Sequence, residues 1–164
     1  MKNENLIFNT ISEIGLRIMF ILDELKPEKV DLDRLNYFDY LMLYMNDGEM
    51  QMNSLHPEYP MMLVELFAKK ELLKRSLLYI GSKSLITIEC SANGINYSGN
   101  INTNWFLDSL VDEEYSQELI KRAKIIKEKF NVYKNSELKE LIETRTKNKE
   151  KKFEYLFPYK EGEL

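Results

Sequence analysis

The sequence predicts a mainly helical fold with one β-hairpin, arranged as a winged-helix-like domain followed by C-terminal helices. Apolar residues recur at helical spacing in several segments, and one short stretch is rich in β-branched residues around Asn93-Gly94. No pattern of long parallel strands competes with this order of elements. We expect residues 1–100 to form the winged-helix-like domain and residues 101–164 to form a helical extension that packs on it or on a partner.

The first expected helix begins after Thr10. Thr10 and Glu13 have the spacing of a capping box, in which each side chain satisfies a free backbone amide of the other residue. Pro27 should end the helix, because the residue before a proline is disfavoured in helical geometry. Apolar residues at helical spacing predict one buried stripe between these limits, formed by Ile11, Ile14, Ile18, Ile21, Leu22 and Leu25.

Two further helical regions are expected before the hairpin. Asp31 is a good N-cap for the first, which Asn46-Asp47-Gly48 should end. A polar loop over residues 49–59 follows, and Pro60 suits the first helical turn after it. The pattern then predicts two short helices, over residues 61–68 and 70–80, with Gly81 as the C-terminal cap. In the region that begins after Asp31, the inner face of the helix should carry Leu35, Phe38, Leu41, Met42 and Met45.

The hairpin is the clearest strand signal in the chain. Residues 85–90 and 95–98 are rich in β-branched side chains, and Asn93-Gly94 is typical of a tight turn with positive φ angles. Helices are expected beyond it, over residues 104–110, 116–130 and 136–152. The last of these becomes highly charged, and such a helix is marginal on its own.

The composition is typical of a folded domain without disulfide bonds or membrane-spanning segments. The chain has 164 residues, of which 44% are hydrophobic and 30% charged, and this is ordinary for one folded domain. Cys90 is the only cysteine, so no intrachain disulfide can form. Because Cys90 lies in the expected strand over residues 85–90, we expect it to be a small buried side chain. Neither a signal-peptide pattern nor a membrane-spanning apolar run is visible, so we expect a cytoplasmic protein that does not contact the membrane.

The charges are unevenly distributed along the chain. The net charge of −4 is not typical of a protein that binds nucleic acid on its own. Acidic residues outnumber basic residues up to Glu65. Five basic residues then follow, which we call the basic strip: Lys69, Lys70, Lys74, Arg75 and Lys83. This strip is either a solvated helix face or a surface that docks a partner or contacts nucleic acid.

The sequence predicts no active site, no cofactor and no metal centre. His56 is the only histidine, which excludes paired-histidine zinc sites, and no phosphate-binding loop with its lysine occurs. Asp31 is better used as a helix cap than as a ligand, and residues two apart on a helix, such as Asp31 and Asp33, do not face each other. Asp39 completes no local set of converging oxygens. We therefore expect a protein that works by binding other macromolecules.

Two groups of residues are candidates for partner binding. One is a loop that either fixes the start of the following helix or contacts a partner: Ser54, Leu55, His56 and Pro57. The other is a set of tyrosines near helical spacing, of which Tyr37 and Tyr44 are the candidates. These tyrosines either pack their rings and expose their hydroxyls, or form an aromatic interface.

A series of short motifs occurs in a characteristic order: Arg17–Leu22, Asp31–Leu35, Asp39-Tyr40, Ser54–Pro57, Glu65-Leu66, Glu71–Leu73, Leu85-Ile86, Gly94 and Tyr97. Together they resemble the middle component of bacterial ABC-three-component systems. The resemblance implies a winged-helix adaptor in anti-phage systems of the Lamassu type, beside an SMC-like ATPase and a nuclease-type effector. The ATPase would hydrolyse ATP and the effector would cut DNA, so this chain would meet DNA only through the assembled complex.

Two functions remain open at this point. The first is a non-catalytic accessory subunit that docks on the ATPase and helps to restrain or position the effector. The alternative is a stand-alone winged-helix transcriptional regulator that binds DNA through the basic strip. The net negative charge of the chain argues against that alternative, because proteins that bind DNA specifically usually make several phosphate contacts. An unrelated small enzyme is the remaining alternative.

Overall fold

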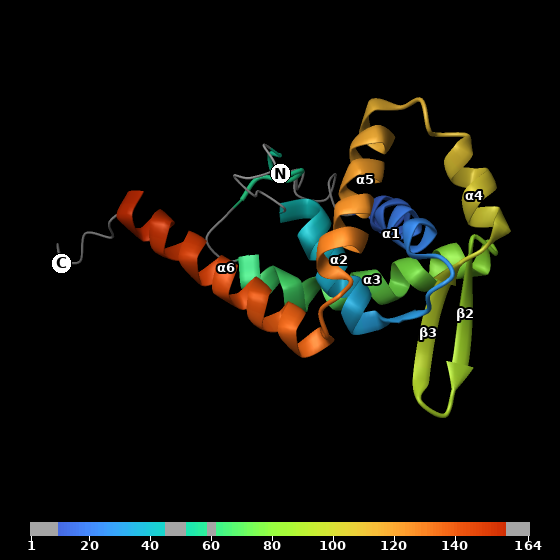
Figure 1. Cartoon of the computed structure of the whole chain (residues 1–164), viewed down its shortest axis with the longest axis horizontal. Coiled ribbons are helices and arrows are strands. Elements are labelled where there is room, and N and C mark those ends of the chain that lie inside the picture. Colours follow the sequence, from blue (N-terminus) through green and yellow to red (C-terminus); the bar gives the residue numbers. More distant parts are fainter. Residues whose placement is uncertain (1–9, 45–51, 59–61, 157–164) are drawn as a thin grey trace, which may run out of the picture.

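The computed structural model describes residues 10–44, 52–58 and 62–156 (Figure 1). The elements follow in the order α1 (Ile11–Leu25), β1 (Val30–Asp31), α2 (Leu32–Tyr44), α3 (Met62–Ser82), β2 (Ile86–Ser91), β3 (Gly94–Gly99), α4 (Ile101–Asp108), α5 (Glu114–Ile125), the π-helical turn η2 (Ile126–Phe130) and α6 (Asn135–Leu156). The expected mainly helical fold with a hairpin is confirmed. Met45, the Asn46–Gly48 helix end and Pro60 lie outside the described residues.

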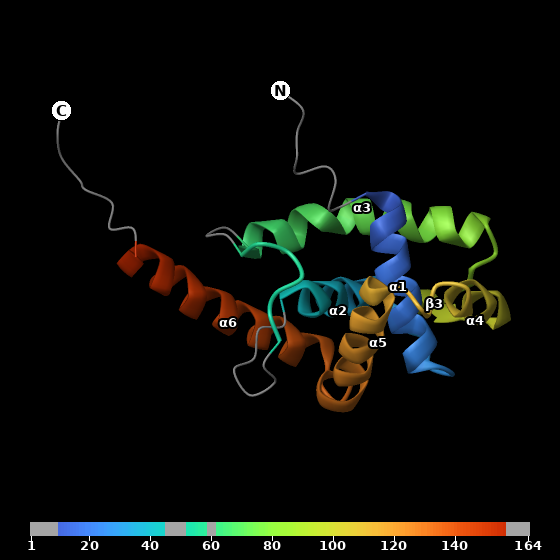
Figure 2. The same cartoon turned by 90° about the horizontal axis from the view of Figure 1, so that it is seen from above.

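Helix α1 lies at the centre of the fold, where it contacts α2, α3, α4, α5 and β3 (Figure 2). Its N-terminus is capped as expected, because the Thr10 hydroxyl accepts a hydrogen bond from the Glu13 amide at 3.2 Å. The Glu13 carboxylate, however, contacts Arg17 and His56. Every residue from Arg17 to Leu22 is buried. The predicted stripe is buried except at Ile11, but burial is not confined to one stripe, since the middle of this helix is covered on all sides.

Helix α2 is preceded by a strand that the sequence analysis missed. Val30 pairs with Tyr97 and Asp31 pairs with Asn96, which adds β1 to the hairpin and gives a three-stranded antiparallel sheet of order β1-β3-β2. The Asp31 carboxylate then accepts a hydrogen bond from the Arg34 amide at 2.8 Å, as expected of an N-cap. Most of the helix is buried, and its hydrophobic residues belong to the same core as those of α1.

Helix α3 is one continuous helix, so the prediction of two short helices is wrong. Leu66, Leu73 and Leu77 keep one face buried through the charged middle of the helix. Gly81 is not a left-handed cap either, because the helix runs to Ser82 and the positive φ, 57°, falls on Ser84. Helix α3 packs against α1 at Gly15, where a Cβ atom would meet Ile80 Cγ2 at 2.7 Å.

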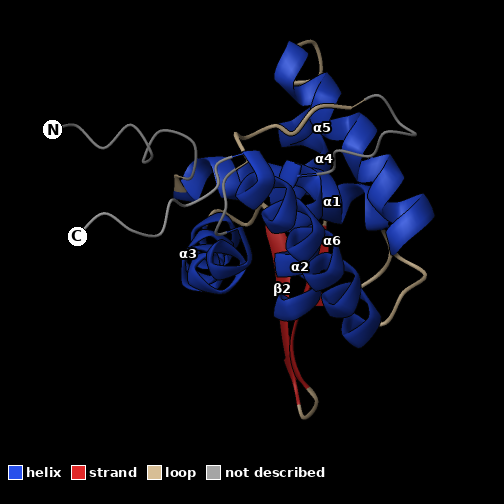
Figure 3. Cartoon of the chain, turned by 90° about the vertical axis from the view of Figure 1, so that its left-hand side faces the viewer, coloured by secondary structure: helices blue, strands red, loops and turns tan. Residues whose placement is uncertain are grey.

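The hairpin of β2 and β3 projects away from the helices (Figure 3). Its ladder runs from Ile86 paired with Gly99 to Ser91 paired with Gly94. The two-residue loop is therefore Ala92-Asn93, one residue earlier than predicted, and within the hairpin Gly94 alone takes a positive φ, 117°. Cys90 lies exposed on β2, so the expectation of a buried cysteine is wrong.

The C-terminal helices pack on this unit from two sides. Helix α4 begins earlier than predicted, because Asn100 and Thr103 form a capping box. Helix α5 packs on α1, while α6 contacts α2 and α3 and extends away from the core (Figure 2). Among the described helices, we find no segment that combines the length and the apolarity needed to cross a bilayer.

Candidate partner-docking groove

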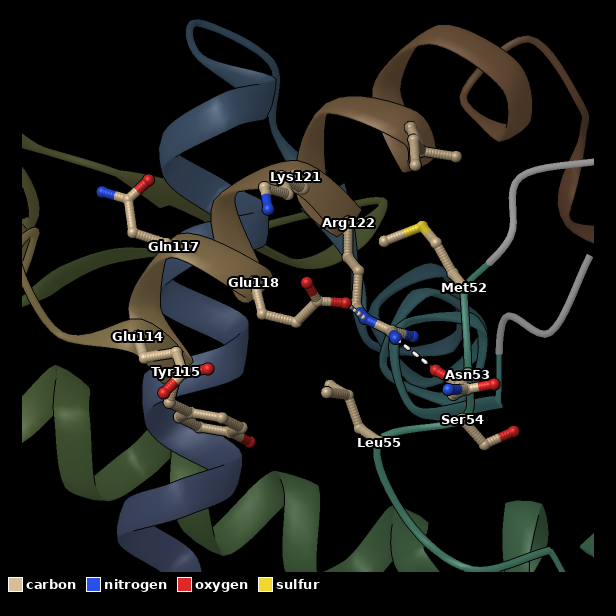
Figure 4. Close-up of a pocket in the computed structure, with 11 residues that line it drawn as sticks. Met52, Asn53, Ser54, Leu55, Glu114, Tyr115, Gln117, Glu118, Lys121 and Arg122 are labelled. Atoms are coloured by element: carbon tan, nitrogen blue, oxygen red, sulfur yellow. Dashed lines mark hydrogen bonds and ion pairs between the residues drawn. The ribbon is translucent and has the colours of Figure 1, made fainter.

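An open groove of about 950 Å³ lies between α5 and the loop that precedes α3 (Figure 4). The loop contributes Met52–Leu55, including two residues of the predicted partner-binding loop. Helix α5 contributes Glu114, Tyr115, Glu118 and Lys121 to the opposite wall. Carboxylates, an ammonium group and apolar side chains all line the groove, which suits a polar protein surface better than a small apolar ligand.

Arg122 fixes the floor of the groove. The residue is 1% exposed, and its Nη1 donates a hydrogen bond to the Met42 carbonyl at 3.0 Å. Its Nη2 donates to the Asn53 carbonyl, and its Nε donates to Glu118 Oε1 at 2.9 Å (Figure 4). One guanidinium thus connects α5, the end of α2 and the loop. Because both walls are tied to it, the groove has a defined shape.

A second buried arginine, Arg17, joins α1 to α2. Arg17 donates two hydrogen bonds to the Asp39 carboxylate, at 2.7 and 3.1 Å, and one to Glu13 Oε1 at 3.1 Å. Its side chain is fully buried, and burial alone would lower its pKa. The charges of Asp39 and Glu13 outweigh that effect and raise the pKa of Arg17 above its usual value. The group is therefore permanently charged and serves as a bidentate connector between α1 and α2.

Glu13 connects this arginine to the loop and to α5. Its Oε1 also lies 3.2 Å from His56 Nε2 and accepts a hydrogen bond from the Tyr115 hydroxyl at 3.4 Å. Burial raises the pKa of Tyr115, so this hydroxyl stays protonated as a donor at neutral pH. Glu13 therefore joins three segments of the fold, and through Tyr115 it links the buried Arg17 to the wall of the groove.

The residues predicted to contact a partner divide into two groups. His56 and Tyr44 are buried: His56 faces Glu13, and the Tyr44 hydroxyl donates to Glu65 Oε2 at 2.6 Å. Both side chains therefore support the structural alternative for their segments. The accessible members are Ser54 and Leu55 at the groove, together with Pro57 and Tyr37. Contact between these residues and a partner stays a prediction.

The basic strip is largely neutralised by neighbouring acids. Lys70 forms an ion pair with Asp33, and Lys74 forms one with Glu71 at 2.6 Å. Within the described ranges, Arg75 and Lys83 have no acidic partner, and Lys83 lies over the Tyr79 ring at 5.9 Å. The remaining member, Lys69, pairs with Glu65 and is largely buried. Contact of the strip with nucleic acid stays a prediction that rests on two freely exposed charges.

Most of the chain matches a known protein family. A family model for the ABC-three component (ABC-3C) system Middle Component 2 matches residues 7–152, which is most of the chain. No curated protein and no solved structure matches it. The match includes α1 with Arg17, the loop with His56 and α5 with Arg122, so both buried arginines and the groove lie inside it. The chain therefore belongs to the family of ABC-three component system middle component 2.

Proposed function

We propose that this chain is a non-catalytic accessory subunit of an anti-phage defence complex. It docks on an SMC-like ATPase component and helps to restrain or position a nuclease-type effector. Membership of the middle-component family carries this proposal, because a middle component is by name one part of a three-component system. Under this proposal, ATP hydrolysis and DNA cleavage belong to the other two components.

The architecture supports the adaptor role. The element order α1-β1-α2-α3-β2-β3 and the strand order β1-β3-β2 are those expected of a winged-helix domain, with the hairpin as its wing. The buried charged groups are used to hold the fold together: Arg17 with Asp39 and Glu13, and Arg122 with Glu118. The groove beside them is a preformed surface, which suits docking without a large rearrangement.

One observation favours the adaptor over the stand-alone DNA-binding regulator. Residues 84–100, which contain the whole hairpin, include Glu89 and neither lysine nor arginine. A wing that follows the DNA backbone needs positive charge, because phosphate contacts supply most of the affinity for DNA. The wing and the neutralised basic strip together leave the regulator with few phosphate contacts.

Co-expression with the other two components of the same system tests the proposal. We expect a tagged copy of this chain to purify together with the ATPase component, and ATP turnover to require that component. The isolated chain should neither hydrolyse ATP nor cut DNA. Turnover by the isolated chain that is lost on one point substitution within it, or failure to form any complex at micromolar concentration, would overturn the proposal.

The groove offers a matched pair of variants for the same assay. Lys121 lines the groove, whereas Lys124 lies exposed on the same helix outside it. We expect Lys121→Glu to weaken the complex and Lys124→Glu to leave it unchanged. Equal effects of the two reversals would show that net charge matters and that the groove does not.

A further inference from the structure

The charged side chains between Lys83 and Lys121 are all acidic. This segment contains no lysine or arginine, and its acids are Glu89, Asp108, Asp112, Glu113, Glu114 and Glu118. Two of them are neutralised, Glu89 by Lys29 and Glu118 by Arg122. Within the described part of the chain, the four acids from Asp108 to Glu114 have no ion-pair partner, and all four are exposed. The end of α4 and the turn to α5 therefore present uncompensated negative charge.

Large apolar side chains are exposed in the same place. Trp105, the only tryptophan of the chain, is 67% exposed, and Ile101 one turn earlier is 60% exposed. Phe106 and Val111 beside them are each 39% exposed. We call Ile101, Trp105, Phe106, Val111, Asp108, Asp112 and Glu113 the α4 surface. Helix α4 itself lies at the edge of the molecule (Figure 1).

The exposure of Trp105 follows from how α4 is held. The Thr103 hydroxyl donates to the Leu85 carbonyl at 2.5 Å, and the side-chain amide of Asn102 donates to the Ser84 carbonyl at 2.9 Å. Thr103 and Leu107 are buried against the body, so Ile101 and Trp105 lie on the outer side of the helix. A firmly held helix thus presents its largest side chain to solvent.

The charges that neighbouring elements bring close do not cancel this surface. Lys26 donates to the Asn100 carbonyl at 3.0 Å but is already paired with Asp23 at 2.5 Å. Lys29 is already paired with Glu89 at 2.6 Å. A nucleic acid or an anionic membrane would meet like charge here. A second copy of this chain, docked face to face, would place acid against acid.

We propose that the α4 surface docks a protein surface that is basic and carries an apolar pocket for the Trp105 indole. The inference rests on the proposed function. It assigns the basic partner surface to another component of the same complex. Tryptophan is enriched among residues that dominate binding energy, and such residues lie in a dry centre surrounded by a polar rim. Asp108, Asp112 and Glu113 supply that rim and steer the basic partner.

The single tryptophan makes a direct test. The chain is labelled with 5-fluorotryptophan, which gives one ¹⁹F resonance from position 105, and is titrated with the unlabelled partner components. We expect the resonance to shift on complex formation. Trp105→Ala should weaken binding about 30-fold. Asp112→Lys with Glu113→Lys should slow association at about 0.05 M salt, with a smaller effect at about 0.5 M.

Matched controls lie elsewhere on the exposed surface. Phe67 on α3 is 56% exposed, and Glu128 and Glu140 are exposed acids outside the α4 surface. Phe67→Ala, and Glu128→Lys with Glu140→Lys, should leave the affinity unchanged. Circular dichroism confirms that all variants fold, which is expected since each changed side chain is exposed.

The outcomes separate this inference from the proposed function. A complex that forms with an unshifted resonance, and that tolerates both sets of α4-surface variants, overturns the inference and leaves the proposed function standing. Failure to form any complex overturns both. A resonance that shifts with the concentration of this chain alone shows self-association, and this also overturns the inference.

Discussion

Arg17 and Arg122 each join segments that are remote in the sequence. Arg17 on α1 reaches Asp39 on α2, whereas Arg122 on α5 reaches carbonyl groups at Met42 and Asn53. Arginine suits both positions, because its planar guanidinium offers five donors and stays charged when buried. A buried arginine without its acceptors would be costly, so these contacts restrict how α2, α5 and the loop can be arranged.

Arg17→Met should lower the free energy of unfolding by about 3–5 kcal/mol, because Asp39 would remain buried without its counter-charge. Urea unfolding followed by circular dichroism measures the change. Lys29→Met is the control, since the Lys29–Glu89 pair is about half exposed and should contribute less than about 1 kcal/mol. Adding Asp39→Leu to Arg17→Met should recover part of the loss. A double variant that is no more stable than Arg17→Met contradicts this account.

Lys69 should make stability depend on pH in a defined direction. Burial lowers its pKa to about 8 from an ordinary value of 10.5. Between these two pH values the unfolded chain binds more protons at this site than the folded chain. The contribution of Lys69 to the free energy of unfolding therefore rises with pH across that window and is constant below it. Lys69→Met should remove this rise.

Unfolding of the parent chain and of Lys69→Met between about pH 7 and 11 measures this contribution as a difference, in which other titrating groups cancel. Lys70→Met provides a control of opposite sign. The hydrogen bond with Asp33 raises the pKa of Lys70, so its stabilising contribution is lost only as the pH rises above 10.5. If the difference for Lys69→Met does not change with pH, the Lys69 ammonium is not desolvated.

At the scale of elements, α3 has one buried face and one face that solvent reaches. Leu77 is fully buried whereas Leu78, the next residue, is 67% exposed. Leu77→Asp should unfold the domain or leave it insoluble, because an unpaired buried carboxylate costs several kcal/mol, comparable to the stability of a whole domain. Leu22→Asp in α1 should do the same, since Leu22 is also fully buried.

Leu78→Asp is the matched control for this substitution. It introduces the same charge one residue away on an exposed position, so its effect on stability should stay within about 0.5 kcal/mol. Thermal unfolding followed by circular dichroism compares the variants. Equal thermal midpoints for Leu77→Asp and Leu78→Asp would show that the register of α3 is wrong.

Elements with local signals were the ones that the sequence predicted correctly. The Thr10 cap, the Asp31 cap and the hairpin around Gly94 depend on residues within a few positions of each other. Strand β1 was missed, because Val30 and Asp31 form a strand only by pairing with the distant β3. The break predicted near Lys69 does not occur, since Glu65 one turn earlier neutralises that lysine within a continuous helix.

The sequence indicated residues of only one wall of the groove. Ser54 and Leu55 stood out as a motif, but no local pattern indicates that α5 forms the opposite wall. The position of Arg17 inside an apolar helix was the one sign of a buried ion pair, and its partner Asp39 lies 22 residues away. Arg122, in a helix that carries several lysines, gives no such sign. Long-range pairing of charged groups is set by the assembled fold and is not visible in the spacing of residues.

At the scale of the whole molecule, charge is separated by region. The end of α4 and the turn to α5 are acidic and the hairpin carries neither lysine nor arginine, whereas the basic strip on α3 is largely paired with acids. Net charge of −4 adds a general repulsion from DNA. This distribution favours protein partners over nucleic acid for the isolated chain.

The isolated chain should bind duplex DNA only weakly at physiological salt, with a Kd in the non-specific range of roughly 10⁻⁴–10⁻⁶ M. Titration against a labelled duplex measures it. Reversing Lys70, Lys74 and Arg75 to glutamate should weaken this binding further, because each reversal lowers the net charge by two units. In the assembled complex, the same triple variant should weaken ATPase docking or the grip on DNA. Tight and sequence-selective binding by the isolated chain, with a Kd near about 10⁻⁸ M, that the triple reversal abolishes would establish the stand-alone regulator in place of the adaptor.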